Sequence, residues 1–236
     1  MMSDIAINMQ LLTSVIEIVP PMMLGALVVI TLVIIKGDIC PGQRGRLHKV
    51  LPVIAGGWAI SSYSYLYLAP LALVLMYYYF QVRKGKARES GPVSILIAVN
   101  VLAFLVLVFQ LVVAKSWLST IALVLYVPLL GSVFAHLLLV IAATRLPAFH
   151  RILPVVGVVS AMLISLCALP YAHGLSDTQL DMNKGFILFS FISLVFSFAV
   201  WIWHLLLSQK PGKFQLSLAL LILSLSSVGF LHLFNN

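Results

Sequence analysis

The sequence predicts an all-α integral membrane protein, and composition, apolar stretches and loop length support this. The chain has 236 residues, of which 62% are hydrophobic and only 8% charged, and its mean hydropathy is +1.14. A soluble domain carries about a quarter charged residues. Apolar stretches of about 20 residues, enough to cross a ~30 Å hydrocarbon core, recur along the chain. The longest polar connections, 36–49 and 172–185, are short, so we expect one polytopic membrane domain, residues 1–236.

The apolar stretches define the expected helices in chain order. No cleavable signal is expected, because Met1–Ser14 lacks a basic region and a small-residue cleavage site. The stretches are Val15–Ile35, Val50–Phe80, Val93–Ala114, Leu118–Thr144, Ile152–Tyr171, Phe186–Leu207 and Phe214–Phe234.

The stretch Val50–Phe80 decides between seven and eight helices. As one helix its 31 residues would be about 46 Å long, which exceeds the bilayer core even with the usual tilt. As a hairpin it would break near Tyr67–Pro70, with arms at Leu47–Leu66 and Pro70–Arg83. Proline fits the first position of a helix, so the second arm has a suitable start. We therefore predict eight transmembrane helices, with seven as the alternative.

Loop charges favour the hairpin. A single helix would place six Lys and Arg residues on one side and eight on the other, whereas the hairpin places twelve on one side and only Lys115 and Lys184 opposite. The positive-inside rule produces such a split. It predicts that both termini lie on the outer side of the membrane. The net charge of +8 then indicates orientation and contact with anionic membrane lipids, and no nucleic acid partner is expected.

A possible internal repeat agrees with this topology. The sequence HKVLPVI at His48–Ile54 returns as HRILPVV at His150–Val156, after an apolar helix and a basic loop in each case. Copies in the same orientation require an even number of crossings between them, and the hairpin gives four. Parallel repeats are a known way to build helical membrane proteins. This predicts two parallel four-helix repeats, 1–116 and 117–236.

Ionisable residues within membrane helices are costly and mark candidate sites. Glu17 precedes two prolines that disturb the first helix. It is either an interfacial carboxylate at a helix N-terminus or a proton acceptor and quinol ligand. His136 is the most deeply placed histidine, and it either bonds to a neighbouring helix or binds a cofactor.

Haem and metal are not expected in this chain. A bis-histidine haem needs two histidines at equal depth, and the expected helix ends place His136 and His204 roughly 7 Å apart in depth. Cys40 and Cys167 are too few for an iron–sulfur cluster, which usually takes four thiolates.

The expected outer layer gathers groups suited to a quinol. A carboxylate, imidazoles and a phenol at one depth can hold two hydroxyls and accept protons, and imidazole titrates near neutrality. Trp117 in the same layer suits an interfacial aromatic belt. The candidate quinol-binding residues are Glu17, Tyr67, His173 and His232.

Six sequence features spread along the chain carry a family resemblance. They are LVIIKGD (32–38), Trp58, YLAP (67–70), LLGSVFAHLLL (129–139), RILPVVGVVSAM (151–162) and GFLHLF (229–234). In these features the chain resembles the DmsC-type membrane anchor of dimethyl sulfoxide reductases. This resemblance implies a haem-free anchor in a bacterial inner membrane, with both termini periplasmic, that oxidises menaquinol and passes electrons to an iron–sulfur subunit joined to a molybdopterin catalytic subunit. The family's quinol-linked histidine near the end of its second helix corresponds here to Tyr67, which departs from the pattern.

Two other functions fit the same sequence. A permease for small solutes or lipids would line a cavity with Asn100, Gln110 and Gly131. A structural membrane subunit would need no site of its own. Whether the chain takes part in catalysis is therefore open at this level.

Overall fold

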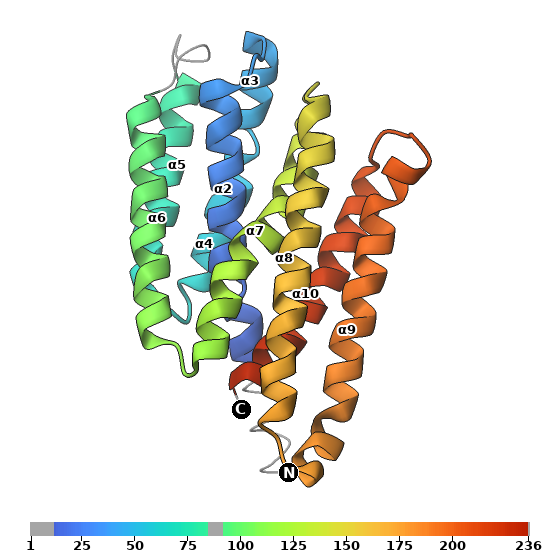
Figure 1. Cartoon of the computed structure of the whole chain (residues 1–236). Helices are drawn as coiled ribbons and strands as arrows, with labels where there is room; N and C mark the ends of the chain where they lie inside the picture. The colour runs from blue at the N-terminus through green and yellow to red at the C-terminus, as the bar shows by residue number, and fades with distance from the viewer. Residues whose placement is uncertain (1–11, 85–91, 236) are drawn as a thin grey trace.

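The computed structural model describes residues 12–84 and 92–235, and all regular secondary structure in these ranges is helical (Figure 1). A helical segment at residues 12–17 precedes the first long helix. The elements are α2 (Val19–Lys36), α3 (Pro41–His48), α4 (Leu51–Ser61), the 3-10 turn η1 (Leu66–Leu68), α5 (Ala69–Lys84), α6 (Val93–Val113), α7 (Trp117–Ile141), α8 (Pro147–His173), α9 (Asp177–Leu206) and α10 (Lys213–Asn235).

Six of the described helices are long and apolar enough to cross a membrane. They are the continuous segment Leu12–Lys36, which contains α2, and the five helices α6 to α10. Each has at least 21 residues, and about 20 residues span the hydrocarbon core. The prediction of an all-α membrane protein is therefore confirmed.

The disputed stretch Val50–Phe80 forms two helices and not one. Helix α4 ends at Ser61, where the Ser61 and Ser62 hydroxyls donate to the carbonyls of Gly57 and Ala59. After a turn and η1, α5 begins at Ala69 and runs back beside α4 (Figure 1). The expected first arm was too long, because α3 ends at His48 and a turn separates it from α4. With 11 and 16 residues, α4 and α5 fall short of the usual spanning length.

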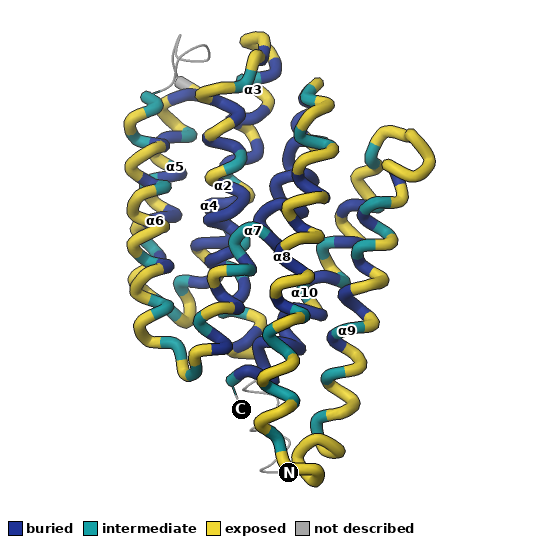
Figure 2. Tube along the Cα trace, viewed as in Figure 1, coloured by how far each residue is buried: buried dark blue, intermediate teal, exposed yellow. Residues whose placement is uncertain are grey.

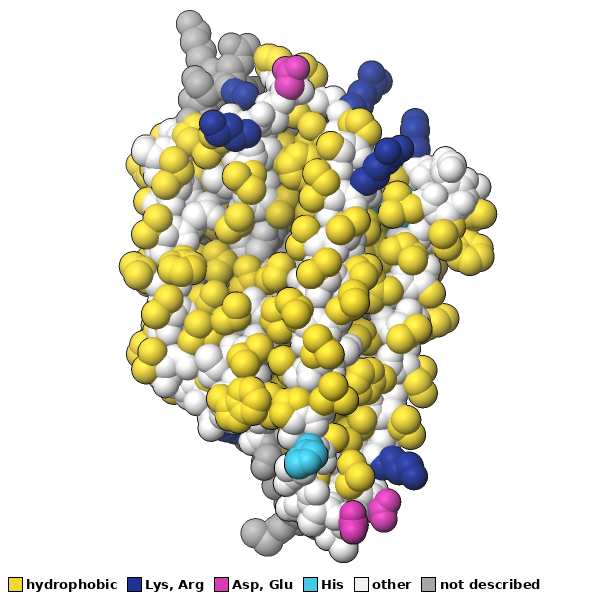
Figure 3. All heavy atoms as spheres, in the orientation of Figure 1, with side chains coloured by type: hydrophobic (Ala, Val, Ile, Leu, Met, Phe, Trp, Pro, Cys, Tyr) yellow, Lys and Arg dark blue, Asp and Glu magenta, His cyan; other side chains and the backbone are white. Residues whose placement is uncertain are grey.

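Successive long helices alternate in direction, which gives the molecule two distinct ends. One end, called here the terminal end, holds the end of α10 and the start of the helical segment that precedes α2, together with the α6–α7 and α8–α9 connections (Figure 1). At the opposite, basic end Lys and Arg side chains gather in the view of Figure 3. Lys86 and Arg88, two of the twelve cations predicted for one side of the membrane, lie outside the described residues.

The helices form two groups joined by α2 and α7. In the first group α2 packs against α4 and α6, α4 against α5, and α5 against α6. In the second, α7 packs against α8 and α10, α8 against α9, and α9 against α10. The four helices of each group therefore contact one another in the same order along the chain. The first group ends at α6 and the second begins at α7. The repeat of 1–116 in 117–236 stays a prediction.

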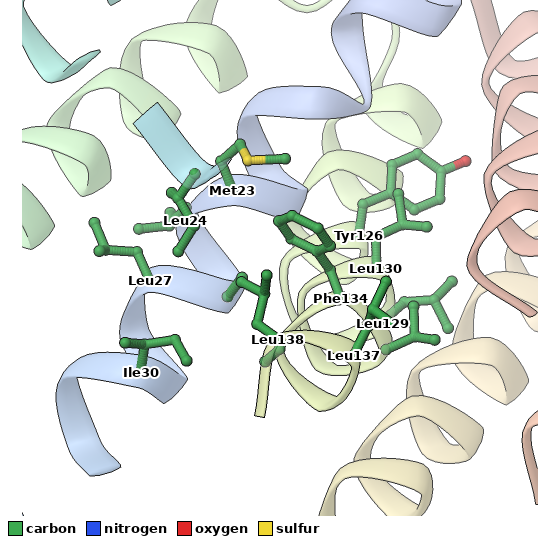
Figure 4. Close-up of a cluster of buried hydrophobic side chains, with 14 of the residues drawn as sticks. Met23, Leu24, Leu27, Ile30, Tyr126, Leu129, Leu130, Phe134, Leu137 and Leu138 are labelled. Carbon is green, nitrogen blue, oxygen red and sulfur yellow. The ribbon is translucent and has the colours of Figure 1, made fainter. Parts of the chain in front are cut away.

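The core lies where α2 crosses α7. In both helices 67% of the most apolar stretch is buried, against 22% in α6 and α9, whose outer faces are open (Figure 2). At the crossing, a Cβ on Gly25 would collide with the Val127 carbonyl oxygen, and one on Gly131 would collide with the Gly25 backbone. Small residues allow such close backbone approach between membrane helices. Leucines of both helices, Met23 of α2, and Tyr126 and Phe134 of α7 pack around this contact (Figure 4).

We expect Gly131→Ala and Gly25→Ala to destabilise the fold by about 1–3 kcal/mol each, because the added methyl must push two backbones apart. The matched control is Gly56→Ala on α4, where an added Cβ meets nothing within 4 Å. That variant should be neutral or slightly stabilising. The free energy of unfolding in detergent micelles measures all three, and equal behaviour of Gly131→Ala and Gly56→Ala would contradict the crossing.

Candidate functional site

A pocket of about 190 Å³ opens at the terminal end between the two helix groups. It is called here the terminal pocket. Its walls come from the segment before α2, the α4–α5 connection, the end of α6, the start of α7 and the end of α10. The lining residues are Glu17, Tyr65, Tyr67, Gln110, Val113, Ala114, Lys115, Ser119, Leu123, Leu231 and Asn235.

The carboxylate of Glu17 is held by two donors in this pocket. The Tyr65 hydroxyl donates to Oε1 at 3.2 Å, and Nδ2 of Asn235 donates to Oε2 at 3.2 Å. Glu17 is half-buried and lies immediately before the break at Ile18, where α2 starts with two prolines in its first turn. Because proline has no N–H, the preceding helical turn cannot continue its full hydrogen bonding into α2. Glu17 lies at this break, where its side chain reaches Asn235 at the end of α10.

A second polar pair faces the same pocket. Tyr67 forms a side-chain hydrogen bond with Gln110 and packs edge-on against Phe109, with ring centroids 5.2 Å apart. Because Oε1 of Gln110 is buried without a hydrogen-bond partner, the Gln110 amide nitrogen is the donor to Tyr67. A buried acceptor left unpaired costs free energy. One of the residues that line the pocket therefore carries a buried, unsatisfied acceptor.

The two tyrosines that line the pocket, Tyr65 and Tyr67, stay protonated at neutral pH. Burial raises the pKa of Tyr65, and the neighbouring charge of Glu17 raises it further. Burial also raises the pKa of Tyr67. Their hydroxyls therefore remain available as hydrogen-bond donors beside the carboxylate.

The structure brings together two of the four predicted quinol residues. Glu17 and Tyr67 line the terminal pocket, whereas His173 and His232 do not. His173 is exposed at the end of α8. His232 is buried on α10 with its ring 5.2 Å from that of Phe186 on α9.

Sequence reasoning missed the residues that complete the pocket. Tyr65 is two positions from Tyr67 but is not among the predicted site residues. Asn235 reaches Glu17 because the end of α10 returns to the start of α2, and no local pattern signals a contact across 218 positions. Of the three residues suggested for a permease, only Gln110 lines this pocket, since Asn100 donates to Thr31 and Gly131 packs against Gly25.

A second polar cluster lies among α7, α8 and α9 in the basic half. Trp201 donates to Nδ1 of His136 at 3.0 Å, and Nε2 of His136 lies 2.9 Å from Nδ1 of His150. Since tryptophan can only donate, neutral His136 carries its proton on Nε2 and donates to His150. The Nδ1 of His204 lies 2.7 Å from the Trp201 carbonyl oxygen. The cluster thus ties three helices together.

This geometry changes the argument about haem. The expected 7 Å difference in depth is wrong, because the rings of His136 and His204 are in edge contact with centroids 5.4 Å apart. Helix α7 ends at Ile141 and not at Thr144, which shifts His136 toward the basic end. Both nitrogens of His136 are already hydrogen-bonded, and the direct ring contact leaves no space for a porphyrin between the two imidazoles. Among the described residues, no group of three His, Cys, Asp or Glu side chains is placed to hold a metal ion.

We expect Trp201→Phe to destabilise the protein by about 1–3 kcal/mol, because it leaves the buried Nδ1 of His136 without a donor. Trp203→Phe is the control, since Trp203 is 56% exposed on the same helix and should change stability by less than about 0.5 kcal/mol. Unfolding in detergent measures both. If both variants lost the same free energy of unfolding, the hydrogen bond from the Trp201 indole N–H would not contribute to stability.

The architecture and the two clusters define a polytopic α-helical membrane protein. A family model described as an integral membrane domain matches residues 1–230, so the chain belongs to this family of integral membrane domains. Comparisons with curated proteins and with solved structures gave no match.

Proposed function

We propose that this protein is the membrane anchor subunit of a quinol-linked anaerobic respiratory oxidoreductase, similar to those of dimethyl sulfoxide reductases, and that it binds menaquinol in the terminal pocket. The observation that supports this most is the pairing, in one pocket, of the Glu17 carboxylate with the unsatisfied Oε1 of Gln110. A quinol has two hydroxyl donors, and these two acceptors suit them. The diffuse sequence resemblance points to the same function.

The size and lining of the pocket agree with a quinol ring. A cavity of about 150 Å³ holds a benzene molecule, and the terminal pocket measures about 190 Å³. Apolar side chains such as Val113, Leu123 and Leu231 contact the ring faces, while a few polar groups fix its orientation. Ligand sites usually combine a mainly apolar lining with a few placed polar groups.

Oxidation of the bound quinol to quinone releases two electrons and two protons. Glu17 accepts the proton of the hydroxyl bound to it and, being partly exposed, releases it to water at the terminal side. Gln110 cannot accept a proton, so the second hydroxyl gives its proton to water that enters the pocket from the same side. Tyr65 and Asn235 hold the carboxylate in place. In this proposal Gln110 and Glu17 replace His173 and His232 as the hydroxyl partners, and Tyr67 positions Gln110.

The electrons pass to an iron–sulfur cluster of a peripheral partner subunit and then to a molybdopterin catalytic subunit, as the resemblance implies. The segregation of cations to the basic end supports an orientation with the terminal end periplasmic in a bacterial inner membrane. In this arrangement α4 and α5 count as two short crossings, which gives eight.

We expect Glu17→Gln to weaken binding of a fluorescent hydroxyquinoline N-oxide, a quinol analogue, by roughly tenfold or more. The amide cannot accept a proton and turns one acceptor into a donor. Asp177→Asn is the matched control, because it removes an exposed carboxylate at the same end outside the pocket. Fluorescence quenching of the analogue by purified protein in nanodiscs gives the affinity. A wild-type protein that binds no quinol analogue would exclude the proposed function.

Gln110→Met should lower the affinity for the same quinol analogue by roughly tenfold. The free energy of unfolding should change by less than about 0.5 kcal/mol. Methionine fills a similar volume and removes the unsatisfied acceptor, so the fold loses little. A large loss of stability with unchanged binding would show that Gln110 is structural. Analogue titration and thermal unfolding of the same preparation separate these results.

A further inference from the structure

A second pocket, of about 450 Å³, lies at the basic end between the α3–α4 junction and the end of α5. It is independent of the terminal pocket and is called here the basic pocket. Two of its side chains, Lys49 and Arg83, are cationic and exposed. Its lining residues are Gly45, His48, Lys49, Tyr79, Val82 and Arg83.

One imidazole nitrogen in this pocket has no partner. His48 is only 2% exposed, and its Nε2 lies 3.1 Å from the hydroxyl of buried Tyr78. The opposite nitrogen, Nδ1, is buried and makes no hydrogen bond. When the Tyr78 hydroxyl donates to Nε2, the neutral ring carries its proton on Nδ1. A residue that lines the pocket together with two cations then carries a buried, unpaired N–H donor.

We propose that the basic pocket binds a phosphate group, as carried by the headgroup of an anionic membrane lipid. The phosphate oxygens accept from Nδ1–H of His48 and pair with Lys49 and Arg83. Charge-assisted bonds of this kind are stronger than neutral ones. Basic pockets between membrane helices on the cytoplasmic side are suited to acidic lipid headgroups.

The surroundings of His48 favour an anion over a cation. Burial, and then the charge of Arg44, lowers the pKa of His48 from 6.5 to about 4. Among the described residues, Arg44 on α3 acts on this ring through its charge, the Tyr78 hydroxyl on α5 bonds to it, and Lys49 and Arg83 line the same pocket. None of these carries negative charge at neutral pH, so an incoming phosphate meets no repulsion from them.

The test compares two double variants that remove the same charge from the basic end. Lys49→Gln/Arg83→Gln alters the pocket, whereas Lys36→Gln/Arg151→Gln removes two exposed cations outside it. Melting temperature in detergent is followed while phosphatidylglycerol, cardiolipin, phosphatidylcholine or inorganic phosphate is added. At about a hundredfold excess over Kd, a specific ligand should raise the melting temperature by roughly 5–10 °C.

We expect the anionic lipids to stabilise the wild type and the control variant but not the pocket variant, with little effect of phosphatidylcholine. Stabilisation by inorganic phosphate but not by the lipids, absent in the pocket variant, would also support a phosphate site. The ligand would then be a soluble phosphate and not a lipid headgroup. Equal stabilisation of both double variants, or equal effects of phosphatidylcholine and phosphatidylglycerol, would overturn the proposal.

The pH dependence of phosphatidylglycerol binding provides a second readout. A bound phosphate stabilises the charged imidazole, so it raises the pKa of His48 above about 4 and binding takes up a proton. Affinity should therefore increase as the pH falls from about 6 toward 4. His48→Gln keeps a donor without a titrating group, and its affinity should vary less over this range. An identical pH profile in that variant would remove His48 from the site.

Discussion

The contact between Gly25 and Gly131 is the constraint on which the rest of the structure depends. Lipid is as apolar as the helix surfaces, so close packing has to supply the association of membrane helices. The absence of side chains at these two positions lets the backbones of α2 and α7 touch. Every other long helix of the described chain packs directly or through one neighbour against this pair. Both pockets and the histidine cluster take their geometry from the two groups that the pair joins.

Hydrogen bonding between helices determines where polar groups are tolerated. Most buried polar side chains of the described residues are paired across helices or to a nearby carbonyl, as Tyr126 is to the Ser227 carbonyl and Ser197 to that of Ala219. Unpaired buried atoms are the exceptions that call for an explanation. Two of them, on Gln110 and His48, belong to residues that line pockets. This distinguishes these two positions from residues that serve only to hold helices together.

Hydropathy and charge were sufficient to predict the long helices and the break in Val50–Phe80, because both follow from local composition. The exact end of α4 could not be predicted, since the serine hydroxyls that close it also occur within helices such as α9. The histidine cluster was missed for a different reason. His136, His150 and His204 come from three helices, and their meeting depends on rotation and tilt that no one-dimensional pattern records. Glu17 and Tyr67, predicted as quinol residues, line the terminal pocket, and so does Gln110, which was suggested for a permease cavity. The role of Asn235 could not be predicted, because its contact with Glu17 depends on how the end of α10 packs.

The unequal helices give the molecule two hydrophobic thicknesses. The apolar part of α5, Ala69–Phe80, is about 18 Å long, whereas the apolar part of α9, Phe186–Leu206, is about 32 Å long. Both expose apolar side chains, for example Leu73 on α5 and Val195 on α9. A bilayer adapts to such differences by thinning beside short helices and by thickening, or helix tilting, beside long ones. The membrane around this protein is therefore expected to slope from one flank to the other, which favours neighbours with short spans beside α5.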